Sequence, residues 1–249
     1  MNTAVASVPA RHRGVVITGA SSGVGRALAL AFAGNTEDLA LIGRDVGRLE
    51  EVAHETERRG TRASCFVADL ASRDAVQRVA RDVQRKLDAI SVLVHSAGVF
   101  VSGTFDAVTP DDFDSVLEVN LRAPYMLTRE LLLALGRGEG DVVFINSSVV
   151  QQRREGLAAY GASKHALLAL ADSLRQEVNP HGIRVLSVFL GATATRMQEQ
   201  IHADHPEDYH PEGLLQPCDV ASAVLSSIDL PRGAEVTDLF LRPSHRHRG

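Results

Sequence analysis

Tyr160 and Lys164, four residues apart, are the side chains in this sequence whose types and spacing best suit proton transfer. They fall in a stretch that predicts a helix over about 157–178, where residues four apart share one face. A lysine ammonium beside a phenol favours the phenolate, so the tyrosine pKa should fall from about 10 toward working pH. An acid/base group is most effective near that pH. Alone, such a pair is more often part of a solvated helix face, so its surroundings decide the interpretation.

Two serines stand where a partner for this pair is needed. The run 141–145 predicts a β-strand, and Asn146, Ser147 and Ser148 follow it directly. Ligand-binding residues of α/β sheets lie beyond the carboxyl ends of the strands. A hydroxyl at that edge can hydrogen-bond a substrate oxygen as charge develops on it. We favour Ser147 for this role and keep Ser148 as the alternative.

A glycine-rich turn, Thr18-Gly-Ala-Ser-Ser-Gly-Val-Gly25, joins the apolar run 15–17 to a helix expected over about 24–33. Glycine lets backbone N–H groups approach a phosphate closely, and a helix start adds a partial positive charge. The G-x-x-x-G-x-G spacing differs from the general dinucleotide fingerprint, and the alternative is an ordinary strand-to-helix turn. Its place after the first strand of an α/β series favours a nucleotide diphosphate.

An arginine follows the second apolar run, which ends in Gly43-Arg44-Asp45. In dinucleotide-binding folds the end of this strand faces the adenosine ribose. An acidic residue there favours the free 2′-hydroxyl of NAD, whereas an arginine accommodates the 2′-phosphate of NADP. The planar guanidinium can donate two parallel hydrogen bonds to a phosphate. We therefore predict NADP(H) as cofactor, with NAD(H) the weaker choice, unless Arg44 only caps a surface turn beside Asp45.

The elements that must position these residues alternate along the chain. Apolar runs that predict strands lie at 15–17, 39–42, 63–67, 90–94, 141–145, 183–190 and 236–241, and helical stretches lie at 24–33, 46–59, 73–87, from near 111, 157–178 and 219–228. Apolar strands separated by long helices predict a parallel sheet covered on both faces, and right-handed crossovers make it doubly wound. We expect a single-domain, Rossmann-like α/β fold of about seven strands over 14–243. A lid is expected at about 193–216, with flexible ends at 1–13 and 244–249.

Composition excludes several classes of function. The 249 residues carry a formal net charge of -5, which disfavours a nucleic-acid partner. Cys65 and Cys218 imply no disulfide framework, and two free thiols suit the cytoplasm. No apolar run approaches the ~20 residues of a membrane span, so no membrane partner is expected. The lid histidines His202, His205 and His210 lack a matching pattern of carboxylates or cysteines, so no metal site is predicted.

Taken together, these motifs resemble the short-chain dehydrogenase/reductase family across essentially the whole of 14–241. The matching residues are the TGxxxGxG turn at Thr18–Gly25, the pair Asp69-Leu70, the strand-four motif His95-Ser-Ala-Gly98, the helix residue Asn120, Ser147 thirteen residues before the tyrosine, and the YxxxK pair Tyr160 and Lys164. Their order along the chain is that of the family, which makes the resemblance specific.

The resemblance implies a role for each matched residue. Tyr160 would exchange a proton with the substrate oxygen, and Ser147 would hold that oxygen. Lys164 would lower the tyrosine pKa and bind the nicotinamide ribose, and Asn120 would hold a water near Lys164 for proton relay. The cofactor-binding residues predicted from motif and resemblance are Gly19, Ser21, Ser22, Gly23, Val24, Gly25, Arg44, Asp69, Leu70, Ala97, Gly98, Asn120, Tyr160, Lys164, Gly191 and Thr193.

Three features depart from the family pattern. His95 and Ser96 replace two asparagines, which we interpret as structural variation and not as a new catalytic base. Leu190 stands before Gly191 where relatives have proline, so a fixed φ is lost at the entrance to the lid. The usual glycine-rich ending after the last strand is missing. The resemblance implies a homo-oligomer, a dimer or a tetramer, but relatives often pack through this region, so its departure leaves the oligomeric state open.

The leading hypothesis is an NADP(H)-dependent oxidoreductase that reduces a ketone or aldehyde to an alcohol, with Tyr160 as general acid/base. Its partner would be a small carbonyl or alcohol compound. One alternative is an NAD(P)-dependent alcohol dehydrogenase working in the oxidative direction with the same residues. Another is a catalytically silent nucleotide-sensing protein, which the presence of Asn120, Ser147, Tyr160 and Lys164 disfavours.

Overall fold

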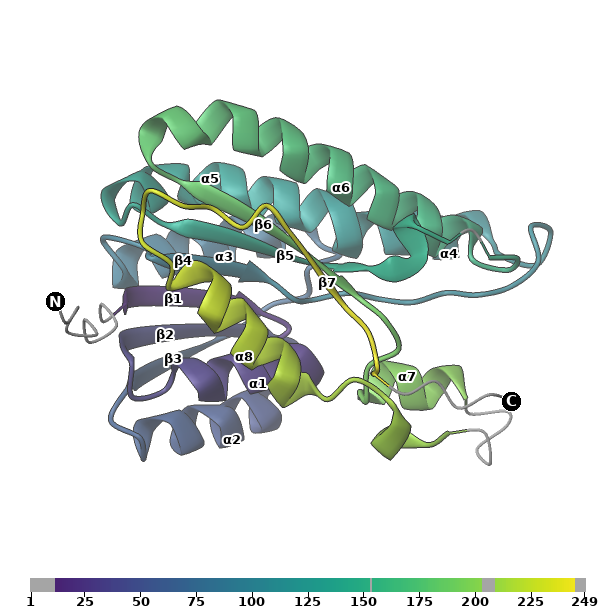
Figure 1. The fold of residues 1–249 in the computed structure, drawn as a ribbon, viewed down its shortest axis with the longest axis horizontal. Helices are drawn as coiled ribbons and strands as arrows, with labels where there is room; N and C mark the ends of the chain where they lie inside the picture. Colours follow the sequence, from purple (N-terminus) through teal and green to yellow (C-terminus); the bar gives the residue numbers. More distant parts are fainter. Residues whose placement is uncertain (1–11, 153, 203–208, 245–249) are drawn as a thin grey trace, which may run out of the picture.

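Seven parallel strands form one sheet in the computed structural model, which describes residues 12–152, 154–202 and 209–244 (Figure 1). Their order is β3-β2-β1-β4-β5-β6-β7. The strands are β1 His12–Thr18, β2 Thr36–Gly43, β3 Arg62–Val67, β4 Val92–His95, β5 Asp141–Ser147, β6 Arg184–Leu190 and β7 Asp238–Leu241. The chain runs outward from β1 to β3 and then returns to β4 on the other side of β1. This reversal is the topological switch point at which such sheets bind ligands.

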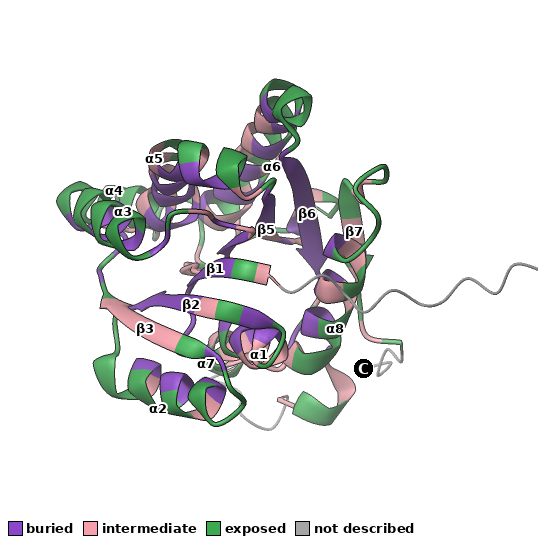
Figure 2. Cartoon of the chain, turned by 90° about the vertical axis from the view of Figure 1, so that its left-hand side faces the viewer, coloured by how far each residue is buried: buried purple, intermediate pink, exposed green. Residues whose placement is uncertain are grey.

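Helices cover both faces of the sheet, as Figures 1 and 2 show. One face carries α1 Gly23–Phe32, α2 Val46–Glu57 and α8 Pro217–Ile228, and the other carries α3 Arg73–Lys86, α5 Ala123–Arg137 and α6 Ala158–Val178. The predicted doubly wound α/β fold is confirmed. Predicted helix bounds differ from the observed ones by two residues or fewer, except for the region that begins near 111.

The strands are apolar on both sides because each side packs against helices. In β1, Val15 and Ile17 join the cluster beneath α1 and α8, whereas Val16 joins the cluster beneath α3 and α5. All three side chains are fully buried. This is the alternation of a strand with a period of two, applied to a sheet with no wet face.

The helical region that begins near 111 is interrupted where the sequence predicts continuity. Helix α4, Pro110–Leu117, begins with a capping box in which Thr109 and Asp112 bond reciprocally. A π-helical turn, Glu118–Arg122, follows and leads directly into α5. Such turns add one residue to the helical repeat and shift the side chains that it carries. Asn120, one of the predicted catalytic residues, lies in this turn.

The segment expected as a lid contains its own short elements. Helix α7, Arg196–Ile201, was not predicted, and a 3-10 turn lies at Pro211–Gly213. A bridge between Thr193 and Leu215 joins the two ends of the segment. At the chain's start, β1 includes His12 and Arg13, which the sequence assigned to the flexible leader. Within the described residues, the structure contains no helix long and apolar enough to cross a bilayer.

Candidate active site

A cleft of about 1140 Å³ lies at the carboxyl ends of the strands around the switch point. It brings together nearly all the residues that the sequence singles out. Gly19, Ser21, Ser22, Gly23, Val24, Arg44, Asp69, Leu70, Ala97, Gly98, Ser147, Ser148, Tyr160, Lys164, Gly191 and Thr193 line it. Gly25 and Asn120 stand behind this lining, and both support residues that form it.

The glycine-rich turn is packed so closely that side chains would not fit. Gly19 has φ +68, and a Cβ placed on it would lie 2.8 Å from the backbone nitrogen of Ala97. A Cβ on Gly25 would lie 2.3 Å from the carbonyl oxygen of Gly19. Thr18 ties the turn to the loop after β4, because its Oγ1 accepts from the N–H groups of Ser96 and Ala97, each at 3.1 Å. These contacts bring the loops after β1 and β4 to one wall of the cleft.

The N-terminus of α1 is free to bind an anion. Ser22 is its N-cap residue, but no side chain caps the helix there, and its first turn holds no acidic residue. Side chains cap α2 at Asp45, α3 at Ser72 and α4 at Thr109, whereas α5, α6 and α8 also begin without a side-chain cap. The first N–H groups of a helix need acceptors, and the helix dipole favours negative charge there. A closely packed glycine turn with an uncapped helix start therefore fits the diphosphate of a dinucleotide.

Two arginines lie at the end of β2. Arg44 is exposed on the cleft and, among the residues that the structure describes, makes no hydrogen bond or ion pair. Arg48, one turn into α2, also lines the cleft and pairs with Asp45, with 3.3 Å between Nε and Oδ2. Arg48 was not among the residues predicted from the sequence. An arginine four residues after the predicted one, at the start of a helix, was the signal that could have identified it.

Tyr160 and Ser147 meet at the opposite side of the cleft. Ser147 is the last residue of β5, and Tyr160 lies in the first turn of α6. Ser147 lowers the pKa of Tyr160 by less than burial raises it. Phe100, which the sequence analysis did not select, contacts the tyrosine ring edge-on with 5.0 Å between centroids. Ser148 also lines the cleft, but it begins a separate 3-10 turn.

Lys164 is buried one helical turn beyond Tyr160. Its Nζ donates to the carbonyl oxygen of Ile145 at 3.0 Å and lies 5.8 Å from the centre of the Tyr160 ring. Burial lowers the pKa of Lys164 to about 8. From the sequence, this lysine was expected to lower the pKa of Tyr160. In the structure the pKa of Tyr160 is raised instead, because desolvation by burial outweighs the other influences.

Asn120 holds the cleft wall together from behind. Its side chain accepts from the N–H of Val99 at 2.9 Å and donates to the carbonyl oxygen of Val99 at the same distance. It also donates to Ser163 Oγ at 3.1 Å. Ser163 precedes Lys164 on α6, so Asn120 joins the loop after β4 to the helix that carries the Tyr-Lys pair. A Cβ placed on Gly98 would lie 3.4 Å from Asn120 Oδ1 and 4.0 Å from Lys164 Nζ.

His95 is held in the protein interior. It stacks on Phe144 with 5.0 Å between ring centroids, and its Nε2 lies 2.7 Å from Thr128 Oγ1. Burial lowers the pKa of His95 to about 3. The side chain therefore stays neutral at ordinary pH, and His95 is not among the residues that line the cleft. This placement agrees with the interpretation of His95 as structural variation.

Described residues of the lid segment line the cleft, and Thr195 among them lies against Gly23 at the start of α1. Thr193 Oγ1 donates to the carbonyl oxygen of Gly191 at 2.9 Å. Thr195, which the sequence analysis did not select, caps α7, and its methyl group would lie 3.1 Å from a Cβ placed on Gly23. Of the three lid histidines, His202 and His210 are described and His205 lies outside the described residues. Within the described part of the chain, no three histidine, cysteine or acidic side chains cluster as metal ligands.

Known proteins share both this sequence and this fold. A family model described as short chain dehydrogenase matches residues 13–206. Nodulation protein G of Rhizobium sp. (strain N33) is 33% identical over 196 residues, covering 78% of this chain and 79% of that protein. An alcohol dehydrogenase from the archaeon Thermococcus sibiricus, complexed with 5-hydroxy-NADP, is 28% identical with a TM-score of 0.85 and covers 95% of this chain and 99% of its own.

A second solved structure, of a putative short chain dehydrogenase from Escherichia coli CFT073 complexed with NADPH, is 29% identical. Its TM-score is 0.83, and the match covers 92% of this chain and 95% of that chain. The family model and these relatives agree over most of the described domain. This chain belongs to the short-chain dehydrogenase/reductase family of oxidoreductases.

Proposed function

We propose that this protein is an NADP(H)-dependent reductase that converts a ketone or aldehyde to an alcohol. The observation that carries the proposal is the meeting of two sets of residues in one cleft. The uncapped start of α1 and the free Arg44 suit a phosphorylated dinucleotide, and Ser147, Tyr160 and Lys164 stand across from them. Structural relatives bound to NADP or NADPH support the choice of cofactor.

Different residues of the cleft would bind different parts of the cofactor. The N–H groups at the start of α1 would hold its diphosphate, and Arg44 would hold the 2′-phosphate. Asp69 and Leu70 would contact the adenine, and Lys164 the nicotinamide ribose. When bound, the nicotinamide supplies or accepts the hydride, and the protein supplies placement and electrostatics.

Tyr160 and Ser147 would act on the substrate oxygen. Ser147 Oγ would donate a hydrogen bond to it, and Tyr160 would deliver a proton as negative charge develops there. Because burial raises the pKa of Tyr160, the phenol is protonated at neutral pH, which is the form that a reductase needs at the start of a turnover. Reprotonation would pass along the Lys164 side of the site, which Asn120 holds in position through Ser163 and Val99.

Cofactor binding tests this proposal before any substrate is known. We expect NADPH to bind more tightly than NADH in calorimetry, and Arg44→Ala to raise the NADPH dissociation constant by roughly tenfold to a hundredfold. The dissociation constant for NADH should stay unchanged, because NADH lacks the 2′-phosphate. Arg58→Ala, which changes an exposed arginine at the end of α2 outside the cleft, is the matched control.

Other outcomes would redirect the assignment. Equal or tighter binding of NADH would overturn the 2′-phosphate interpretation and favour an alcohol dehydrogenase working in the oxidative direction. Binding of NADPH without turnover of any carbonyl compound or alcohol would favour the nucleotide-sensing protein. If neither cofactor bound, the proposed function would be wrong.

A further inference from the structure

Two arginines line the same cleft as the Tyr-Lys pair, and the mechanism above uses neither of them. Arg154 lies in the loop that connects Ser147 to the tyrosine helix, six residues before Tyr160. Arg196 is the first residue of α7, directly after Thr195, on the lid side. Each is exposed, and they approach the cleft from different elements.

Neither guanidinium is neutralised by a carboxylate within the described residues. Arg154 Nη2 has only the amide oxygen of Gln152, at the long distance of 3.4 Å, and Arg196 makes no hydrogen bond or ion pair there. Elsewhere the chain pairs many of its arginines closely with acids, as in Arg26 with Glu55 at 2.8 Å and Arg122 with Glu118 at 2.6 Å. Arginine keeps its charge at any working pH and offers a planar fork to an anion.

We propose that the substrate carries an anionic group besides its reacting carbonyl, and that Arg154 and Arg196 bind that group. A carboxylate or a phosphate has the charge and geometry that two guanidinium groups recognise. The inference rests on the proposed function and narrows its substrate class to anionic carbonyl compounds.

Two features of the cleft bear on this assignment. Glu155, beside Arg154, also lines the cleft and would repel an anion placed close to it. Arg154 and Arg196 together carry two positive charges, against the one negative charge of Glu155. Thr195 lies against Gly23, so Arg196 could instead reach the cofactor's diphosphate. The substrate and the cofactor are separable by experiment, because only one of them changes when an acid is replaced by its ester.

The test compares carbonyl compounds that carry an anionic group with neutral counterparts. One arm uses 4-oxopentanoate against its methyl ester, and a second uses dihydroxyacetone phosphate against dihydroxyacetone, which separates carboxylate from phosphate. For the preferred pair we expect the anion to have the higher kcat/KM. Arg154→Gln and Arg196→Gln should each raise the KM of the anion by roughly tenfold to a hundredfold. The KM of the neutral partner and the NADPH dissociation constant should not change.

Arg81→Gln, which changes an exposed arginine on α3 outside the cleft, is the control for a general change of charge. The inference is overturned if the neutral compounds are used as well as the anions in both arms. It is also overturned if Arg196→Gln weakens NADPH binding and leaves the preference between anion and neutral compound intact. If no compound is reduced, the proposed function fails separately. Calorimetric binding of each pair to the protein saturated with NADP+ then decides the inference by the same comparison.

Discussion

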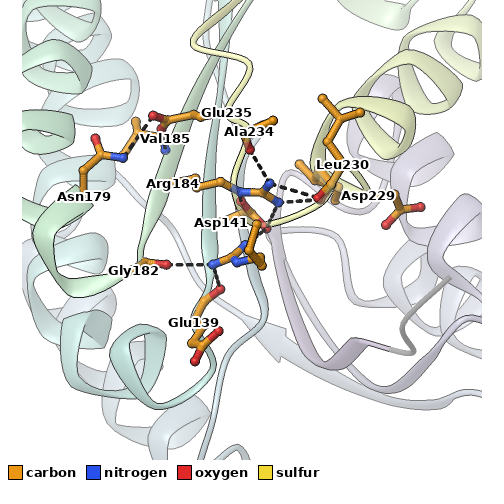
Figure 3. Close-up of polar contacts among 12 residues, drawn as sticks. Glu139, Asp141, Asn179, Gly182, Arg184, Val185, Asp229, Leu230, Ala234 and Glu235 are labelled. Carbon is orange, nitrogen blue, oxygen red and sulfur yellow. Dashed lines mark hydrogen bonds and ion pairs between the residues drawn. The ribbon is translucent and has the colours of Figure 1, made fainter. Parts of the chain in front are cut away.

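Strand β5 begins at Asp141 and ends at Ser147. The polar side chains near its two ends differ in how completely other groups of the protein satisfy their hydrogen bonds and charges. At the amino end, Asp141 is buried and bonds Arg184 of the neighbouring strand through both carboxylate oxygens, at 2.6 and 3.1 Å (Figure 3). Arg232 adds a third bond to Asp141 at 3.0 Å. The remaining donors of Arg184 reach backbone oxygens of Ile228, Leu230 and Ala234. The charges of Asp141 and Arg184 are therefore fully matched by partners.

The carboxyl end of the same sheet leaves its polar groups only partly matched. Within the described residues, Arg44 has no partner, and no side chain caps the start of α1. Lys164 is buried with a backbone oxygen as its hydrogen-bond partner, and no carboxylate of the described residues pairs with it. Burial raises the pKa of Tyr160 and lowers the pKa of Lys164, so it favours the neutral form of each side chain.

This difference distinguishes groups that stabilise the fold from groups that remain available to bind a ligand. A buried charge with every hydrogen bond satisfied adds order but has no capacity left to bind anything. A buried or cleft-lining group without a partner costs stability in the free protein and regains it when a ligand supplies the partner. Substitutions at the two ends should therefore affect different measurements.

The largest effect is expected at the carboxyl end, in Tyr160→Phe. The substitution keeps the ring against Phe100 and removes the only atom proposed to donate the proton. We expect the turnover number to fall by roughly a hundredfold to ten-thousandfold, which is the usual contribution of general acid–base catalysis. Steady-state kinetics on a carbonyl substrate measures this fall.

The NADPH dissociation constant and the thermal midpoint of Tyr160→Phe serve as its controls. Both should stay close to those of the unaltered protein, because the substitution leaves the diphosphate wall and the core untouched. Full activity in this variant would remove Tyr160 from the mechanism. A large loss of stability would show that the two ends of β5 are not distinct in the way proposed.

The amino-acid sequence predicts one end of the sheet better than the other. The carboxyl end follows from local patterns, because Gly19 to Gly25 and the Tyr160–Lys164 pair each lie within eight residues of chain. The fold itself follows from apolar runs alternating with helices. The network at the amino end does not follow in this way, since Asp141, Arg184 and Arg232 come from three segments more than 40 residues apart and show no pattern.

Three features of the site could not be predicted from the sequence because they depend on the folded chain. The π-helical turn at Glu118–Arg122 leaves no mark in the apolar periodicity, so the displacement of Asn120 could not be anticipated. The pKa of Tyr160 depends on how deeply the phenol is buried, which a spacing of four residues does not report. Phe100 was missed because only the folded chain brings it to the cleft, whereas Arg48 did have a signal, its place four residues after Arg44.

At the amino end, Arg184→Met tests the matched network. The side chain is nearly as long but cannot bond Asp141, which would keep only Arg232 as a charged partner. Removing one member of a buried ion pair typically costs about 3–5 kcal/mol. We expect urea unfolding to show a loss of this order, with NADPH binding unchanged at a temperature where the variant stays folded.

The matched control for Arg184→Met is Arg62→Met at the exposed edge of the sheet. Arg62 pairs with Asp38 at 2.6 Å, yet the arginine side chain is 71% exposed. Solvent screens such pairs, so the unfolding midpoint should change little. If both variants lost the same free energy of unfolding, burial of the Asp141 network would add nothing to the stability that the network contributes.

The smallest effect is expected for Lys164→Met at the carboxyl end, where the substitution should change stability and activity in opposite directions. Burial lowers the pKa of Lys164 to about 8 from its ordinary 10.5, so the unfolded chain binds more protons than the folded protein between these values. The free energy of unfolding contributed by this residue therefore rises with pH from about 8 to about 10.5, and its cost is fully present below pH 8. Lys164→Met removes that cost and also the hydrogen bond to Ile145. We expect the variant to be inactive but more stable at pH 7, by about 1–2 kcal/mol.

That gain in Lys164→Met should shrink as pH rises from 7 to 9.5, a range that stays below the raised pKa of Tyr160. Urea unfolding at several pH values measures it, and Lys86→Met, at an exposed lysine of α3, should keep the pH dependence of the unaltered protein. A constant gain across the range would mean that Lys164 is not held toward its neutral form by burial. A loss of stability at pH 7 would mean that Lys164 stabilises the fold, as the groups at the amino end do. The contrast between the two ends would then depend only on Arg44 and the start of α1.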